Sequence, residues 1–174
     1  FASQNDQRGA ALHTFLSHIG PIRMLFPIGD DDRRLHGTPY VTRAFIVLNL
    51  FVFFVLQQAG ANTDFIYGWS VIPVEITQGV DLTTTQVVEV GGQRVEIPAE
   101  PGPRPIYLTI LSAMFMHGGY AHLFGNLLYL WIFGDNVEEY MGAVAFGAFY
   151  LLCGVAATLA QVLLDPTGVV PNLG

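Results

Sequence analysis

The sequence predicts an all-α protein that crosses a membrane several times. Of its 174 residues, 52% are hydrophobic and only 12% are charged, which is unlike the composition of an average soluble domain. The apolar residues are also gathered into long runs, and a helix that spans a bilayer needs roughly 17–25 of them. Three segments reach that length, so we expect a polytopic helical protein embedded in a lipid bilayer.

The three expected spans cover residues 41–59, 114–133 and 142–164. Asn49 alone interrupts the apolar centre of the first span. The third span carries no charged residue and has small residues four positions apart, which allow close contact between helices. We therefore expect the third span in the interior of a helical bundle.

The distribution of arginine predicts the orientation of these spans. All seven cationic side chains are arginines; five precede or open the first span, whereas the long connection of residues 60–113 holds two arginines beside six acids. Because positively charged loops stay on the cytoplasmic side, residues 1–40 are expected to be a cytoplasmic segment. The connection of residues 60–113 is then a long outer loop.

The N-terminal segment does not have the pattern of a cleavable signal, since its apolar stretch is broken by histidines, a proline and an arginine. It could form a weakly amphipathic helix on the lipid surface or a solvated tail, and the sequence leaves both open. The apolar face of such a helix would consist of Leu12, Phe15, Leu16 and Ile19.

The long outer loop contains a β-hairpin signal. In "TTTQVVEVGGQRVEIP", polar and apolar residues alternate on both sides of Gly91 and Gly92, which is typical of two strands joined by a glycine turn. The prolines that follow discourage regular structure up to Tyr107, where "YLTILSAMF" predicts a short helix near the interface.

Three polar residues stand out in the second span: His117, His122 and Asn126. On a helix, residues four apart lie on the same face, so His122 and Asn126 converge on one point. Buried polar side chains in a membrane are either hydrogen bonds between helices, worth about 0.6 kcal/mol each, or parts of a functional site. Three of them on one half of a span favour the functional interpretation.

A metal site is a weaker alternative. His117 and His122 are about 140° apart on an uninterrupted helix, and the nearest acids of the span, from Asp135 onward, lie at its opposite end. We therefore expect no metal and no cofactor. A neutral histidine and an asparagine amide can instead donate hydrogen bonds to an oxyanion that develops on a substrate carbonyl, which is half of an acyl-transfer site.

The spacing of His117, His122 and Asn126 closely resembles the second-helix motif of the rhomboid intramembrane serine proteases: histidine, four residues, histidine, three residues, asparagine. The helix end "WIFGDNVEEYMG" is similar as well, with Glu138 and Gly142 at the family's glutamate and glycine positions. Further similar stretches, from about Met24 onward, are "MLFPIGDDD", "TPYVTRAFIVLNLFVF" and "YGWSVIPVEI".

The resemblance implies a rhomboid-like bundle of six helices, with an optional seventh, in which residues 41–174 supply the first three. It also implies a catalytic serine in a Gly-x-Ser-Gly motif on the fourth helix and a histidine on the sixth. "VVPNLG" resembles the approach to that motif, with Gly174 as its first glycine. None of the chain's four serines lies in such a motif, so this chain by itself is expected to be an inactive N-terminal half.

Two functions follow from the resemblance. The first is an intramembrane serine endopeptidase that cleaves transmembrane protein substrates, with His122 and Asn126 as oxyanion donors and His117 holding the loop or a water near the site. The second is a non-catalytic rhomboid-like protein that binds membrane clients. The retained oxyanion donors favour the protease. The expected location is the bacterial inner membrane with the N-terminus inside, and no nucleic-acid partner is expected.

Overall fold

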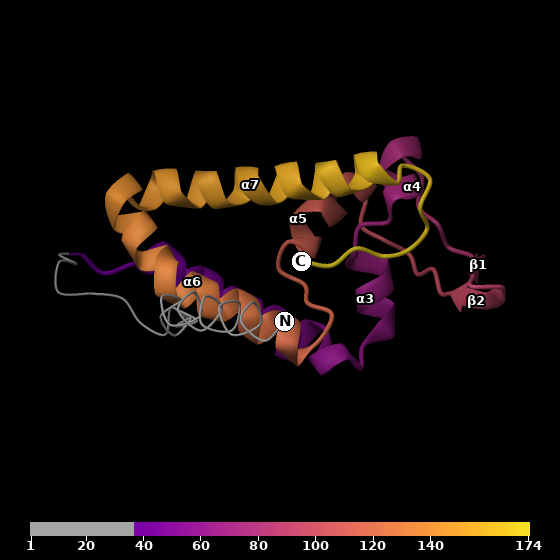
Figure 1. Ribbon diagram of the computed structural model, residues 1–174, viewed down its shortest axis with the longest axis horizontal. Helices are drawn as coiled ribbons and strands as arrows, with labels where there is room; N and C mark the ends of the chain where they lie inside the picture. Colours follow the sequence, from indigo (N-terminus) through magenta and orange to yellow (C-terminus); the bar gives the residue numbers. More distant parts are fainter. Residues whose placement is uncertain (1–36) are drawn as a thin grey trace, which may run out of the picture.

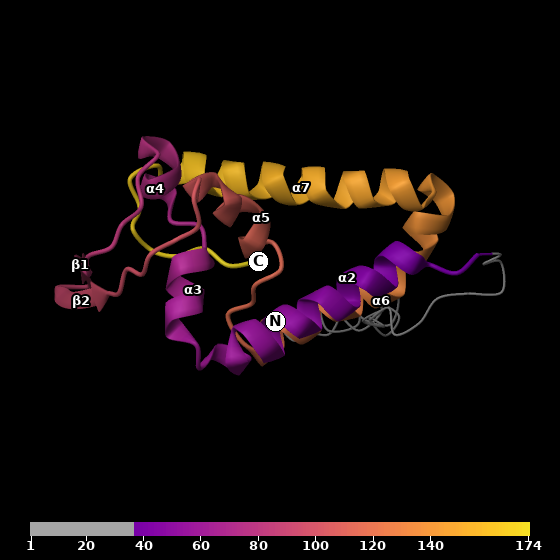
Figure 2. The same ribbon diagram turned by 180° about the vertical axis from the view of Figure 1, so that it is seen from behind.

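The computed structural model describes residues 37–174, which form a mostly helical fold. Helix α2 (Tyr40–Phe51) continues through a π-helical turn, η2 (Val52–Leu56), and lies alongside α6 (Tyr120–Met141). Helix α7 (Ala143–Leu164) starts at the end of α6 and turns back over this pair (Figures 1 and 2). Because α7 diverges from α2 and α6, the three long elements enclose a wedge.

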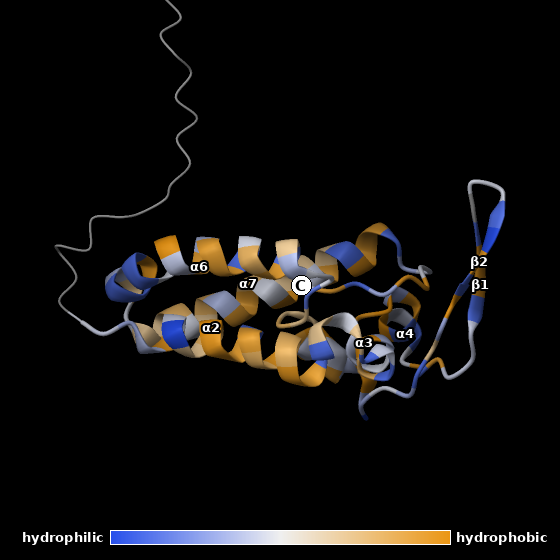
Figure 3. Cartoon of the chain, turned by 90° about the horizontal axis from the view of Figure 1, so that it is seen from below, coloured by the Kyte–Doolittle hydropathy of each residue, from blue (hydrophilic) through white to orange (hydrophobic). Residues whose placement is uncertain are grey.

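The long connection between η2 and α6 fills the open end of the wedge with short elements (Figure 1). It contains α5 beneath α7, α3 and α4 beside it, and a hairpin that stands away from the helices (Figure 3). In chain order the elements are η3 (Gln58–Gly60), α3 (Thr63–Trp69), α4 (Pro73–Gln78), β1 (Gln86–Val90), β2 (Gln93–Ile97), η4 (Ile106–Leu108) and α5 (Thr109–Ala113).

The structure confirms the β-hairpin. Strands β1 and β2 pair in antiparallel register, with Val90 opposite Gln93 across a two-residue turn. Gly91 and Gly92 have φ values of 60° and 81°, and two consecutive positive φ angles are what this type of tight turn requires. The short helix expected after Tyr107 is also present, as η4 and α5.

The second long helix begins later than the sequence indicated. Residues 114–119 are not helical, and α6 starts at Tyr120 after an extended Gly119. The helix then continues to Met141, where Gly142, with φ of 80°, separates it from α7. His117 therefore lies in the linker before the helix and not on it.

A carboxylate from α6 holds the start of α2. Glu138 accepts hydrogen bonds from the backbone N–H of Val41 at 3.0 Å and of Thr42 at 2.8 Å, and from the Thr42 hydroxyl at 2.8 Å. The first N–H groups of a helix have no partner within the helix, and Pro39 at the N-cap offers no side-chain acceptor. Glu138 thus caps α2 from a neighbouring helix.

Helix α7 is the only helix within residues 37–174 that has both the length and the hydropathy needed to span a membrane; the apolar stretch Tyr40–Leu56 is shorter. We expected α7 in the interior of the bundle, but only Phe146 and Val162 are buried among the described residues. The reason is geometric: α7 diverges from α2 and α6 and leaves most of its length uncovered (Figure 2).

A small apolar cluster joins the connection of residues 60–113 to the far end of α7. Its members come from α4, α5, α7 and the residues just before α4, and they are Val71, Ile76, Ala113 and Val162, with Ile110 packed against them. The N-terminal stretch that contains the expected apolar face of Leu12, Phe15, Leu16 and Ile19 lies outside the described residues.

Candidate functional site

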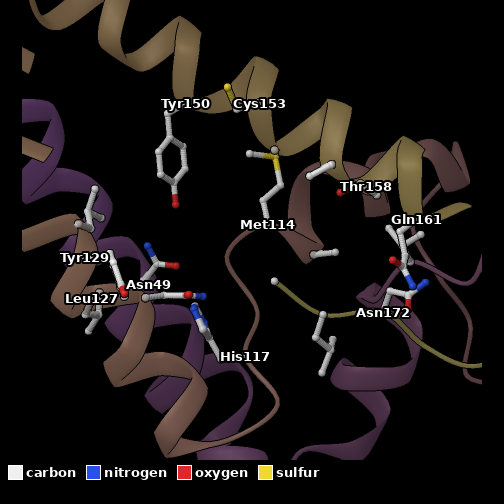
Figure 4. Close-up of a pocket in the computed structure, with 18 of the residues that line it drawn as sticks. Asn49, Met114, His117, Leu127, Tyr129, Tyr150, Cys153, Thr158, Gln161 and Asn172 are labelled. Carbon is white, nitrogen blue, oxygen red and sulfur yellow. The ribbon is translucent and has the colours of Figure 1, made fainter. Parts of the chain in front are cut away.

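A cavity of about 780 Å³ occupies the wedge between α6 and α7. Figure 4 shows His117 and Asn49 on one side of it and Tyr150 pointing across from α7 toward Asn49. Polar side chains line this space although apolar helices surround it. They are Asn49, His117, Asn126, Tyr129, Tyr150, Thr158, Gln161 and Asn172.

The two predicted histidines lie next to each other. Their ring centroids are 5.1 Å apart, with the rings tilted by 67°. The two histidines were expected to lie about 140° apart around an uninterrupted helix, and this expectation is wrong. Helix α6 starts only at Tyr120, so His117 lies in the linker before it, and its ring packs against that of His122. Within residues 37–174, no third histidine, cysteine or acid joins them as a potential metal ligand.

The hydrogen bonding of His122 determines which of its nitrogens can donate. Its Nδ1 accepts a hydrogen bond from the Gly118 N–H at 3.3 Å. In a neutral imidazole, the nitrogen that accepts carries no hydrogen, so the proton resides on Nε2. This tautomer presents an N–H donor at the outer edge of the ring.

The donor edge of His122 faces the end of the segment that follows α7. A Cβ atom added to Gly174 would lie 2.6 Å from His122 Cε1 and 2.9 Å from Nε2. Gly174 also has a positive φ of 81°, so it is a position where glycine fits and a side chain does not. The chain at Gly174 therefore runs directly past the His122 N–H.

Asn126 follows His122 by one helical turn and lines the cavity. The four-residue spacing puts the two residues on the same side of α6, and of the two it is Asn126 that lines the cavity. The amide of Asn126 makes no hydrogen bond to another residue between 37 and 174, so its N–H groups are available to a ligand in the cavity.

The connection of residues 60–113 determines the path of residues 165–174. Val71 and Asn172 exchange backbone hydrogen bonds of 3.2 and 2.8 Å, and the N–H of Gly174 donates to the Ala113 carbonyl at 2.8 Å. These contacts direct the segment back beneath α7 to the middle of the molecule (Figure 1). The loop thereby brings Gly174 to His122.

A buried carboxyl lies in this part of the loop. Glu75 on α4 is only 3% exposed and accepts a hydrogen bond from the Leu82 N–H at 2.8 Å. Burial raises the pKa of Glu75 to about 7; the hydrogen bond from Leu82 opposes this effect and the nearby Asp81 adds to it. The same helix contacts the segment after α7, because the Val74 N–H donates to the Gly168 carbonyl at 3.0 Å.

One site residue was missed by the sequence analysis. Gln57, at the end of η2, is completely buried, and its side-chain amide forms two hydrogen bonds with the backbone of His117. The only sequence signal was a glutamine at the end of an apolar run. Such a residue is usually assigned to the membrane interface.

Comparisons with known proteins agree with the motif. Residues 105–174 match the family model described as "Rhomboid domain". The chain is 27% identical over 131 residues to "Rhomboid protease GluP" of Bacillus subtilis (strain 168), covering 75% of this chain and 21% of that protein.

Two plant proteins are also similar. "Rhomboid-like protein 11, chloroplastic" of Arabidopsis thaliana is 38% identical over 66 residues, which cover 38% of this chain and 24% of that protein. "RHOMBOID-like protein 5" of the same plant is 32% identical over 59 residues, covering 34% and 19%. The chain therefore spans about a fifth to a quarter of the length of these relatives. No solved structure matches it significantly.

Proposed function

The chain belongs to the rhomboid family, and from this premise we propose that the full-length protein is an intramembrane serine endopeptidase that cleaves transmembrane protein substrates. The observation that carries the proposal is the position of His122. Its Nε2–H faces the chain at Gly174, and Asn126 stands one turn further along the same face. One side of α6 thus offers two N–H donors, one from each residue.

These donors suit the transition state of peptide-bond hydrolysis. When a serine attacks a carbonyl carbon, negative charge develops on the carbonyl oxygen, and donors fixed in advance stabilise that charge. His122 and Asn126 supply such donors from one rigid helix. His117 contributes by position: it is 2% exposed and lies against the His122 ring.

The nucleophile is not among the described residues. The hydroxyl of Ser70 donates to the Tyr67 carbonyl at 3.3 Å, and that of Ser112 donates to the Trp69 carbonyl at 2.7 Å. Neither serine contacts His122. The serine and its histidine base are therefore proposed as parts of the full-length protein. The relatives of this chain are four to five times as long as the regions that it matches.

We propose three membrane spans for this part of the protein, built on α2 with η2, on α6 and on α7. The arginine bias places residues 1–40 in the cytoplasm and the loop of residues 60–113 outside. The proposed location is the inner membrane of a bacterium, with several passes.

Cysteine labelling tests this orientation. After replacement of Cys153, which is exposed on α7, a membrane-impermeant thiol reagent added from outside should modify a cysteine at Gln86 and spare one at Asp31. The opposite labelling pattern would reverse the topology.

The test of the enzymatic function uses His122→Ala and Asn126→Ala in the full-length protein. Loss of one oxyanion donor typically lowers turnover by about 10²–10³ while ground-state binding is kept. Cleavage of a transmembrane substrate should fall by that factor, with KM and melting temperature nearly unchanged. Leu128→Ala is the matched control, because Leu128 lies two residues after Asn126 and so projects from the other side of α6.

Two results would refute the assignment. Normal turnover in both variants would exclude these side chains from the oxyanion hole. Absence of cleavage in the wild-type protein, together with retained binding of membrane clients, would support the non-catalytic function instead.

A further inference from the structure

A buried glutamine connects the end of the first long helix to the linker before α6. Gln57 Nε2 donates to the His117 carbonyl at 2.9 Å, and Gln57 Oε1 accepts from the His117 N–H at 2.9 Å. The two residues are 60 positions apart in the chain. We call this pair of hydrogen bonds the Gln57 clamp.

The linker depends on the clamp because it is not helical. Two of its other N–H groups find partners nearby: Phe115 donates to the Ser112 carbonyl and Met116 to the Ala113 carbonyl. The N–H and carbonyl of His117 instead pair with the side chain of a distant residue. A buried backbone group without a partner is costly, so the clamp determines where the chain passes at His117.

The next residue along the linker contacts the proposed oxyanion donor. Gly118 donates its N–H to His122 Nδ1 at 3.3 Å, and this hydrogen bond keeps the proton of the neutral ring on Nε2. A displacement of His117 moves the Gly118 N–H with it, since the two share a peptide unit. The clamp therefore controls the acceptor side of His122 without touching its donor side.

We propose that Gln57 is a positioning residue, which holds His117 and Gly118 so that His122 keeps its Nε2–H directed at the reacting oxygen. The inference rests on the proposed function and extends it to a residue on another helix. Gln57 does not reach the cavity itself; it is completely buried and does not line it. Its effect on the site passes through the backbone of the linker.

The test compares Gln57→Leu with wild type in the full-length protein. Leucine has a similar size but cannot form either hydrogen bond. Because misplacement of a reacting group by about 1 Å can cost about 10²-fold in rate, we expect kcat to fall by about 10- to 100-fold with KM little changed. Gln93→Leu is the matched control, since Gln93 is exposed on the hairpin.

A double-mutant comparison separates positioning from general loss of structure. If Gln57 acts through His122, Gln57→Leu should lower kcat in the wild-type background and have little further effect in the His122→Ala background. An equal reduction in both backgrounds would overturn the proposal. A lowered melting temperature with unchanged kcat in folded protein would also overturn it.

The state of the His122 ring gives a readout that does not need cleavage. In protein with ¹⁵N-labelled histidine, NMR should show the Nε2–H tautomer of His122 in wild type and a mixture with the Nδ1–H form in Gln57→Leu. The same tautomer in both proteins would contradict the proposal even if the protein cleaves nothing. Loss of cleavage in wild type with the expected tautomer change would instead refute only the proposed function.

Discussion

The substitution Glu138→Gln tests how α2 and α6 are held together. The carboxylate accepts three hydrogen bonds from the start of α2, one on Oε1 from the Val41 N–H and two on Oε2 from Thr42. A glutamine amide can keep one oxygen toward Thr42. Its NH₂ group then faces the Val41 N–H, so one donor loses its acceptor and meets another donor.

The expected destabilisation follows from these contacts. A hydrogen bond to a charged group contributes about 1.5–3 kcal/mol and a neutral one about 0.5–1.5 kcal/mol. Glu138→Gln therefore removes one charge-assisted bond and weakens two others, and it also removes a negative charge beside a helix N-terminus. The free energy of unfolding should fall by about 3 kcal/mol. Only 4% of Glu138 is exposed, so water can replace little of this loss.

The assay is denaturant-induced unfolding of the full-length protein in detergent. Glu89→Gln on the exposed strand β1 is the matched control, since it makes the same chemical change on the surface, where substitutions usually change stability by less than about 0.5 kcal/mol. Equal stabilities of the two variants would refute the idea that the carboxylate caps α2.

Three further predictions concern single positions. Glu75→Gln should remove a pH dependence of the free energy of unfolding. Because burial raises the pKa of Glu75 from 4.5 to about 7, wild type should lose up to about 3 kcal/mol of stability as the pH rises through that interval. The variant should not, and unfolding measured at about pH 4 and about pH 8 checks both. Gly134→Ala places a Cβ 2.8 Å from the facing α2 side chain and should cost about 1–3 kcal/mol, whereas Gly125→Ala, with open space around it, should not destabilise α6 in the same unfolding assay. Gly174→Ala, whose Cβ would meet the His122 ring, should lower the cleavage rate of the full-length protein; an unchanged rate would separate Gly174 from the site.

Local patterns predicted several parts of the fold. The alternation around Gly91 and Gly92 is a short-range signal, and the hairpin formed as expected. The apolar run of residues 142–164 predicted a helix of nearly the observed length, α7. The spacing of His122 and Asn126 predicted their common side of α6, because both lie within one regular helix.

The remaining parts depend on contacts between distant segments. The start of α6 at Tyr120 rests on an extended Gly119 and on the Gln57 clamp from 60 residues earlier. No local pattern contains that information, so the orientation of His117 was mispredicted and Gln57 was missed. The exposure of α7 also depends on how helices diverge in space, which its own composition does not reveal.

A hydrogen bond joins the two ends of the segment that carries the hairpin. The carboxylate of Asp81, before β1, accepts a hydrogen bond from the Gly102 N–H, after β2, at 2.9 Å. This contact joins the two ends of the segment without involving the strands between them. Closing a flexible loop costs free energy that grows only slowly with its length. The stretch between these two residues is therefore a permissive insertion point, where a fluorescent or affinity module could replace the strands while α4, α5 and the path of the chain to His122 keep their positions.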